Sequence, residues 1–279
     1  MRCGSRGAGI VLDVGVSASA HLTPRTAGSP PSVRLTERGQ PARLPITQAA
    51  ISALPGIGDW EVEVDLQHDL PISQGLGMSA AGSFASALAV ASALGVPVRH
   101  AAEAAHVAEV RLHGGLGGVS SILGGGIEVR RKAGLPPVGL VERTPLSEGF
   151  FLATLPTPLP SPPLLSDADF LLRVSRAGER WLHELGPPPI RWEALLSVFE
   201  LFTDELGLAP PLLRDTILKV RQLGARASQT MLGNTLLAWA PTEDAEEMLI
   251  QNLRRAKLVI RRVHIGAVGA GLRPAPPEA

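Results

Sequence analysis

The sequence SQGLGMSAAGSFASALAVASALG, from Ser73 to Gly95, places glycines directly before a long run of Ala, Leu and Val. This run predicts a helix from about Ser79 to Leu94, which ends at Gly95 and Pro97. Gly75 and Gly77 let the backbone approach a ligand closely, and the first turn of the helix presents free N–H groups at its positive dipole end. The pattern therefore indicates a corner that is suited to binding an anion.

Two better-known glycine motifs do not fit this corner. Gly75, Gly77 and Ala80 satisfy the dinucleotide pattern G-x-G-x-x-A, but only Val96–Val98 separates the helix from the next one, which leaves no room for the required second strand. A P-loop is excluded because no Gly-Lys-Ser/Thr follows. Two interpretations remain open: a phosphate-binding loop, or an ordinary helix start with Ser79 as its cap.

The rest of the chain predicts an α+β protein in two lobes. Apolar and polar residues alternate from Asp59 to Pro71, which is typical of a strand with one wet face. Proline-rich connections interrupt the chain between Gly134 and Leu165, and helices dominate after them. We expect a boundary near residue 150. The other predicted strands are 7–22, 127–134, 234–241 and 257–268, and the other predicted helices are 99–113, 167–185, 192–206, 211–227 and 243–256.

Composition excludes several classes of protein. The 279 residues carry 26 basic and 26 acidic side chains, so no excess of positive charge indicates a nucleic-acid partner. Cys3 is the only cysteine, which excludes disulfides within the chain. The N-terminus lacks the apolar core of a signal peptide, and the longest apolar run, Ala85 to Leu94, is too short to cross a bilayer. We expect a cytoplasmic protein without a membrane partner.

The second predicted helix carries three polar residues on one face. His106, Glu109 and His113 are spaced by three and four positions. They could form a metal site by themselves, or a solvated polar stripe. The glycine-rich segment 114–126 that follows offers a third interpretation, in which Glu109 faces a cavity walled by backbone amides. A carboxylate beside a polyphosphate is what Mg²⁺ needs.

Taken together, these motifs resemble the GHMP kinase superfamily and, within it, the archaeal pantoate kinases. PISQGLGMSAAG, from Pro71 to Gly82, resembles the superfamily pattern P-x-x-x-G-L-G-x-S-A-A. GSRGAG at Gly4 to Gly9 and HVAEV at His106 to Val110, followed by GLG, resemble more specific motifs of the pantoate kinases. SQTMLGNTLLAWAP, from Ser228 to Pro241, resembles the third, C-terminal motif.

The resemblance implies the GHMP kinase fold. Residues 1–150 would form an N-terminal α/β lobe like ribosomal protein S5, with the phosphate-binding loop, and residues 151–279 a helix-rich C-terminal lobe. The implied reaction transfers phosphate from ATP to pantoate, giving 4-phosphopantoate and ADP on the way to coenzyme A.

The resemblance also assigns roles to single residues. Ser79 and Glu109 would be catalytic and would hold Mg²⁺. The phosphates of ATP would lie on the loop formed by Gly75, Leu76, Gly77, Met78, Ser79 and Ala80. Pantoate would be bound by Ser5, Arg6, His106 and Arg130, of which Arg130 supplies the cation for its carboxylate.

The chain departs from the family pattern at two places. The family has Gly-Leu-Gly-Asp-Val, with Asp as the presumed catalytic base, whereas this chain has Gly118 there and no acidic residue between Gly114 and Ile127. The family also has a strand before GSRGAG, whereas this sequence begins at Met1. Either the start was assigned too late or the strand is lost, and its loss would leave one edge of a sheet bare.

These departures keep three functions open. They are a slow pantoate kinase whose proton acceptor is the substrate or a water, a relative that binds ATP or a small hydroxy acid without turnover, and a kinase for another small hydroxy acid. In the first case, Gly118→Asp should raise the rate if the pocket is otherwise sound. Whether the chain forms a homodimer is left open by the sequence.

Overall fold

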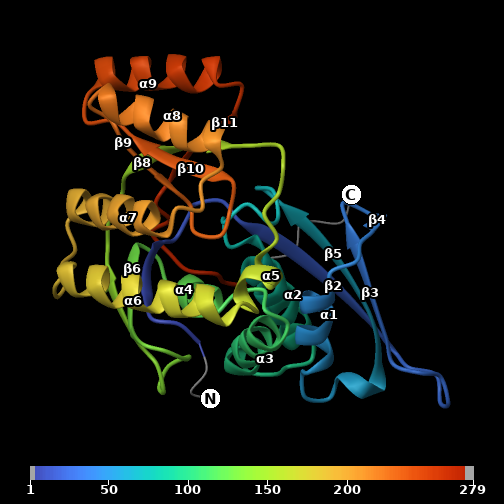
Figure 1. Cartoon of the computed structure of the whole chain (residues 1–279). Coiled ribbons are helices and arrows are strands. Elements are labelled where there is room, and N and C mark those ends of the chain that lie inside the picture. The colour runs from blue at the N-terminus through green and yellow to red at the C-terminus, as the bar shows by residue number, and fades with distance from the viewer. Residues whose placement is uncertain (1–3, 274–279) are drawn as a thin grey trace.

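The computed structural model describes residues 4–273 and shows three β-sheets with helices packed around them (Figure 1). Met1 and Cys3 lie outside the described residues. The α+β class expected from the sequence is confirmed. None of the helices in the described part of the chain has the length and apolar character that a bilayer crossing requires.

The first sheet has four strands, and three helices cover one of its faces (Figure 1). The strand order is β2 (Val16–Pro24), β5 (Trp60–His68), β3 (Ser32–Glu37) and β4 (Gln40–Pro41), and the short helix η1 (Ile57–Asp59) precedes β5. The covering helices are α1 (Pro45–Ser52), α2 (Met78–Ala93) and α3 (Val98–Arg111). Ala87, Ala91 and Ala105 are fully buried, and their small side chains let α2 and α3 approach closely. This approach places the polar residues of the two helices beside each other.

The second sheet also has four strands and belongs to the C-terminal part of the chain (Figure 1). Its strand order is β11 (Val259–His264), β8 (Gly149–Thr154), β10 (Thr235–Trp239) and β9 (Arg226–Gln229). The helices of this part are α5 (Ser161–Leu165), α6 (Ala168–Glu184), α7 (Trp192–Leu206), α8 (Pro211–Gln222) and α9 (Glu243–Arg255). Helices α8 and α9 share an apolar cluster with β8, β9 and β10, while α7 packs into a separate cluster with β8 and β6.

A third sheet, in the order β1 (Gly7–Ile10), β6 (Ile127–Lys132) and β7 (Leu140–Thr144), joins the N-terminal segment to the middle of the chain. The short helix α4 (Gly118–Ile122) precedes β6. All strand pairs in this sheet are antiparallel, and β1 forms one of its edges.

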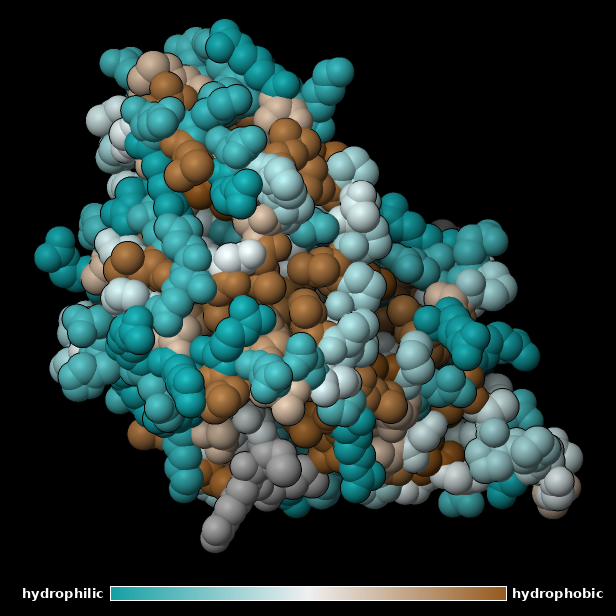
Figure 2. All heavy atoms as spheres, in the orientation of Figure 1, coloured by the Kyte–Doolittle hydropathy of each residue, from teal (hydrophilic) through white to brown (hydrophobic). Residues whose placement is uncertain are grey.

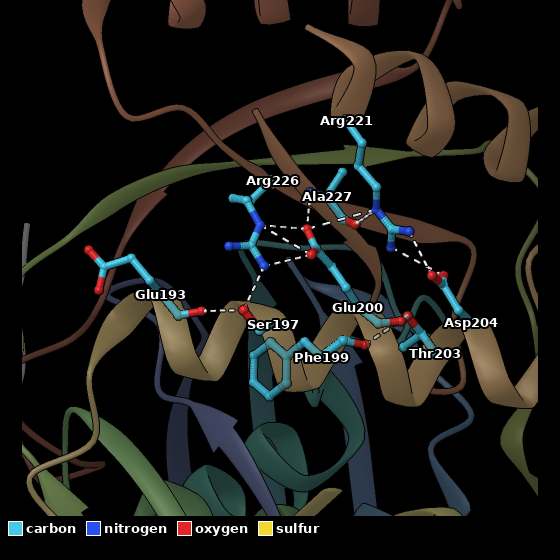
Figure 3. A network of polar contacts seen from close by, with 9 residues as sticks. All are labelled: Glu193, Ser197, Phe199, Glu200, Thr203, Asp204, Arg221, Arg226 and Ala227. Carbon is cyan, nitrogen blue, oxygen red and sulfur yellow. Dashed lines mark hydrogen bonds and ion pairs between the residues drawn. The ribbon is translucent and has the colours of Figure 1, made fainter. Parts of the chain in front are cut away.

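Helix α7 is tied to β9 by a polar network (Figure 3). The carboxylate of Glu200 accepts hydrogen bonds from the Arg226 guanidinium, the nearest at 2.6 Å, and from the backbone N–H of Ala227 at 3.0 Å. Arg221 donates to Asp204 at 2.6 Å and to the carbonyl of Ala227 at 2.8 Å. The hydrogen bond and charge of Glu200 raise the pKa of Arg226. The network fixes α7, which lines the cleft described below.

Three predicted elements are wrong in part. The segment 7–22 is not one strand but two, β1 and β2, which enter different sheets, because Asp13 and Gly15 bond to His264 and Asp69 instead of continuing a ladder. The helix predicted for 211–227 ends at Gln222, since Gly224 adopts a φ of +79° that no helix allows. The proline-rich stretch from 134 to 165 holds β7 and β8 between its proline clusters.

Candidate active site

The glycine corner opens helix α2 as predicted. Gly77 occupies the N-cap with a φ of +70°, and no side chain caps the helix, so its first N–H groups are left for another partner. The hydroxyl of Ser79 does not cap; it donates a hydrogen bond to Glu109 Oε1 at 2.5 Å. The interpretation of Ser79 as an ordinary helix cap is therefore wrong.

Glu109 comes from α3 and is buried against this corner. Only 2% of the residue is exposed, and burial raises the pKa of its carboxyl from 4.5 to about 7, although hydrogen bonds from Ser79 and Ser83 act in the opposite direction. Its second oxygen, Oε2, has no hydrogen-bond partner in the part of the chain that the structure describes. That oxygen lies 2.9 Å from the points where Cβ atoms on Gly114 and Gly115 would stand. An unpaired buried carboxylate oxygen costs stability unless a proton or a cation joins it.

The stripe predicted on α3 is divided between the interior and the surface. His106 and Glu109 are buried, whereas His113 is exposed beyond the end of the helix. Among residues 4–273, no group of three His, Cys, Asp or Glu side chains lies close enough to hold a metal ion. A solvated stripe and a metal site made of these three residues are both wrong.

The glycine loop is fixed by hydrogen bonds between Gln74 and the C-terminal segment 230–234. Thr230 Oγ1 donates to the carbonyl of Gln74 at 3.0 Å, and the Gln74 amide donates to the carbonyl of Leu155 at 2.9 Å. A Cβ on Gly75 would lie 2.7 Å from Thr230 Oγ1, and one on Gly233 would lie 1.9 Å from the carbonyl carbon of Gln74. Glycine is required at both positions because the two backbones touch.

The side chains of the loop itself turn inward. Met78 is buried, and Leu76 packs against the same apolar cluster. Ala80 is buried against α4, where a Cβ on Gly118 would lie 2.6 Å from the Ala80 Cβ. Gly75 to Ala80 therefore offer backbone, and the hydroxyl of Ser79, to the space above them.

Two of the predicted substrate residues meet at Gly117. A Cβ on Gly117 would lie 2.8 Å from Ser5 Oγ and 2.6 Å from Arg130 Nε. The segment of Ser5 is fixed there by a hydrogen bond from its backbone N–H to the carbonyl of Leu116 at 2.8 Å. The guanidinium of Arg130 donates to Ser121 Oγ at 2.6 Å and forms an ion pair with Glu128.

The other two predicted substrate residues, Arg6 and His106, lie further from Gly117. Arg6 forms an ion pair with Glu179 of α6 at 2.5 Å, and both side chains are about half exposed, 48% and 61%. His106 is 2% exposed, and its Cε1 lies 3.4 Å from the point where a Cβ on Gly4 would stand. Its side chain supports the Gly4–Ser5 segment and is not part of the cleft lining.

A cleft of about 2000 Å³ connects these groups. Its lining includes Gly75 to Ala80, Glu109, Ser5 and Arg130, together with apolar side chains of α6 and α7 such as Phe170 and Phe199. Figure 2 shows apolar residues, in brown, gathered over the middle of the visible face and framed by hydrophilic residues. The cleft thus joins an N–H-rich corner, a buried carboxylate and a guanidinium.

Sequence reasoning missed Gln74, Glu128 and Ser121. Glu128 and Arg130 are two positions apart in one strand, so the period of two predicts that their side chains lie on the same face. Gln74 lies inside the quoted glycine stretch, but its role depends on contacts more than eighty positions away along the chain, at Leu155 and Asn234.

Comparisons with known proteins agree with this geometry. A family model described as the GHMP kinases N terminal domain matches residues 46–126. The pantoate kinase of Thermococcus kodakarensis is 31% identical over 252 residues, which cover 88% of this chain and 83% of that protein. A solved structure described as a phosphotransferase related to the CoA biosynthesis pathway is 29% identical with a TM-score of 0.79, covering 95% of this chain and 88% of its own.

A solved structure with much lower sequence identity has the same fold over almost the whole chain. The L. major mevalonate kinase, solved in complex with R-mevalonate, is 14% identical with a TM-score of 0.64, and the match covers 96% of this chain and 91% of that one. At this identity the likeness concerns the fold alone. On the strength of the Thermococcus relative and the matched N-terminal domain, this chain belongs to the pantoate kinase family of GHMP kinases.

Proposed function

We propose that this protein transfers the terminal phosphoryl group of ATP to the 4-hydroxyl of pantoate, giving 4-phosphopantoate and ADP. Membership of the GHMP kinases implies the use of ATP. The observation that carries the proposal is the contact between Ser79 at the start of α2 and the buried Glu109, with an uncapped helix N-terminus beside it.

The glycine corner supplies the phosphate site. The N–H groups of the first turn of α2, with the backbone of Gly75 and Gly77, would donate to the phosphate oxygens of ATP. The side chain of Met78 is buried and that of Leu76 packs partly against the same apolar cluster, which favours a close approach of a triphosphate to the backbone of the loop.

The same corner fits a magnesium ion. Mg²⁺ takes oxygen ligands and is held by one or two protein groups together with substrate phosphates. Ser79 Oγ and the unpaired Glu109 Oε2 are oxygens of this kind, and they would be its protein ligands. When bound, the ion would neutralise charge on the phosphate oxygens.

The acceptor site lies around Gly117. Arg130 would pair with the carboxylate of pantoate, Ser5 Oγ would hydrogen-bond to it, and His106 would support the segment of Ser5 from below. Arg6 lies at the rim in its ion pair with Glu179.

Gly118 leaves the loop without a carboxylate at the position of the family base. Phosphoryl transfer passes through a loose transition state, in which positioning and electrostatic stabilisation do most of the work. The proton of the acceptor hydroxyl would then pass to water or to the phosphoryl group. The binding-only alternative finds no support in the comparisons, because the relatives that match over most of this chain are described as kinases.

ADP release in a coupled assay tests the proposal. We expect ADP to form with pantoate and Mg-ATP together, and not with either alone. Homoserine and mevalonate in place of pantoate test other small hydroxy substrates. If nucleotide binds and no ADP forms at any pH, the chain only binds its ligands and the proposed function is wrong.

A further inference from the structure

One face of the third sheet carries charged residues opposite glycines. Glu128 and Arg130 point to the same side of β6 because they are two positions apart. Their cross-strand partners on β1 are Gly9 and Gly7, and the partner of Glu128 on β7 is Arg143. The missing side chains on β1 leave room for both long side chains: a Cβ on Gly9 would lie 2.7 Å from Glu128 Oε1, and one on Gly7 would lie 2.7 Å from Arg130 Nη2.

Glu128 closes a triangle of polar groups beneath the cleft. It is 1% exposed, and its Oε1 accepts a hydrogen bond from Ser121 Oγ at 2.9 Å and another from Arg130 Nη1. Arg130 Nη1 also donates to Ser121 Oγ at 2.6 Å. Ser121 belongs to α4, the helix that begins at Gly118, so Glu128 ties the guanidinium and the floor of the Gly117 loop to one strand.

The Nε–Nη2 edge of Arg130 packs against Gly117 and Gly7, outside this triangle. Nη1 is occupied, whereas Nε is buried without a hydrogen-bond partner among the described residues, 2.6 Å from the point where a Cβ on Gly117 would stand. The Nε–Nη2 edge of a guanidinium matches the two oxygens of a carboxylate.

The charges around this edge also favour one negative group. Arg143 is held by the carbonyl oxygens of Ser120 and Ser121 at 3.0 and 2.8 Å, and burial lowers its pKa while Glu128 raises it and Arg130 lowers it. Two guanidinium groups therefore share the charge of one carboxylate, Glu128, and of the two only Arg130 lines the cleft, where a ligand with a single carboxylate would pair with it.

We propose that Glu128 is a positioning residue, which fixes the guanidinium of Arg130 and, through Ser121, the Gly117 loop, so that Arg130 is held in place to pair with the carboxylate of the acceptor substrate. The inference rests on the proposed pantoate kinase function. The two hydrogen bonds to Glu128 are both made by Oε1, while Oε2 is buried without a hydrogen-bond partner among the described residues.

Steady-state kinetics of Glu128→Gln test this role. We expect the KM for pantoate to rise by about tenfold or more, because a charge-assisted contact to Arg130 is lost, while the KM for ATP stays within about twofold of the wild type. If Glu128 acts through Arg130, then Glu128→Gln should add little to the effect of Arg130→Ala, so that the two changes are not additive.

Glu142→Gln is the matched control. Glu142 accepts from Arg131 at 2.7 Å in an ion pair of the same sheet, formed by the residue next to Arg130, and it lies outside the cleft lining. We expect its kinetic constants to equal those of the wild type. Urea unfolding of each variant reports any change in stability separately.

Three results would overturn the proposal: an unchanged KM for pantoate in Glu128→Gln, fully additive effects with Arg130→Ala, or equal rises in both KM values that follow a loss of stability. A wild-type protein that forms no ADP with pantoate would instead contradict the proposed function. Calorimetric titration of the wild type and Glu128→Gln with pantoate would then test the positioning role by binding alone, with weaker binding by the variant expected and equal binding as the contrary result.

Discussion

Glu109 is a buried carboxyl group whose desolvation is not offset by its hydrogen bonds. Its raised pKa, about 7 against 4.5, means that the folded state binds a proton more tightly than the unfolded chain does. The stability from this proton is fully present below pH 4.5 and is lost as the pH rises through 7. The free protein therefore loses stability over this window, and a bound cation would take the place of the proton.

We predict that Glu109→Gln abolishes ADP release and makes the free protein more stable at pH 8. Gln carries no charge, so the variant should exceed the wild type in free energy of unfolding by up to about 3 kcal/mol at pH 8 and by almost nothing at about pH 4.5. Urea unfolding of both proteins across this range is the measurement. A stability difference that does not change with pH would show that the carboxylate is solvated, and full activity would exclude it as a metal ligand.

Gly118 replaces the acidic residue of the family pattern, and it is also packed closely against Ala80. A Cβ at this position would lie 2.6 Å from the Cβ of Ala80, which is itself buried on α2. The family pattern suggests that Gly118→Asp should raise the rate. We predict instead that this variant alone gives no increase in rate and loses about 1–3 kcal/mol of stability through overpacking.

The double variant Gly118→Asp with Ala80→Gly separates sterics from chemistry. Removing the Ala80 methyl should restore part of the lost stability, although glycine in a helix costs about 0.5–1 kcal/mol. Thermal unfolding and ADP release of both variants provide the check. If Gly118→Asp alone is as stable as the wild type, α2 and α4 move apart easily and the overpacking argument is wrong.

At the scale of elements, the phosphate loop depends on a segment far away in the chain. We predict that Thr230→Val raises the KM for ATP by about three- to tenfold, because the hydroxyl that holds the Gln74 carbonyl is lost while the side-chain volume is kept. Initial rates at varied ATP measure this effect.

Thr216→Val is the control for the loss of a threonine hydroxyl. Thr216 is buried on α8, and its hydroxyl bonds within the helix to the carbonyl of Leu212 at 2.7 Å. Its KM for ATP should equal that of the wild type. An equal rise in both variants would mean that the loop is not held specifically by Thr230.

Elements with a strong local pattern could be predicted from the sequence, and those set by distant pairing could not. Helices α2, α3 and α9 lie within one or two residues of their predicted bounds, and β5 shows the expected alternation. The separation of β1 from β2, and the strands β3, β7 and β8, depend on partners far along the chain. The same limit applies to the site: the contact of Ser79 with Glu109 follows from two adjacent helices, but the contact of Gln74 with Thr230 does not.

At the scale of the whole molecule, the cleft draws on both predicted lobes. Glu109 and Arg130 come from the first half of the sequence, and Phe170, Phe199 and Thr230 come from the second. One apolar cluster contains Ile127 and Val129 of β6 together with Phe150 of β8 and Leu195 of α7, so the core runs across residue 150. The domain boundary near residue 150 stays a prediction. The shared apolar cluster favours unfolding of the two parts as one unit.

We therefore predict that the protein unfolds in one cooperative transition. Trp60 is the only tryptophan of residues 1–150, and Trp181, Trp192 and Trp239 follow it. In a Trp60→Phe variant, fluorescence reports the C-terminal part alone, whereas far-UV circular dichroism reports the helices of both parts. The two urea curves should coincide, and Mg-ATP should shift them together to higher urea, because a ligand that binds only the folded state stabilises everything coupled to its site. Separate midpoints, or a nucleotide effect on circular dichroism without one on fluorescence, would show two independently folding lobes, and the shared apolar cluster would then be a weak interface between them.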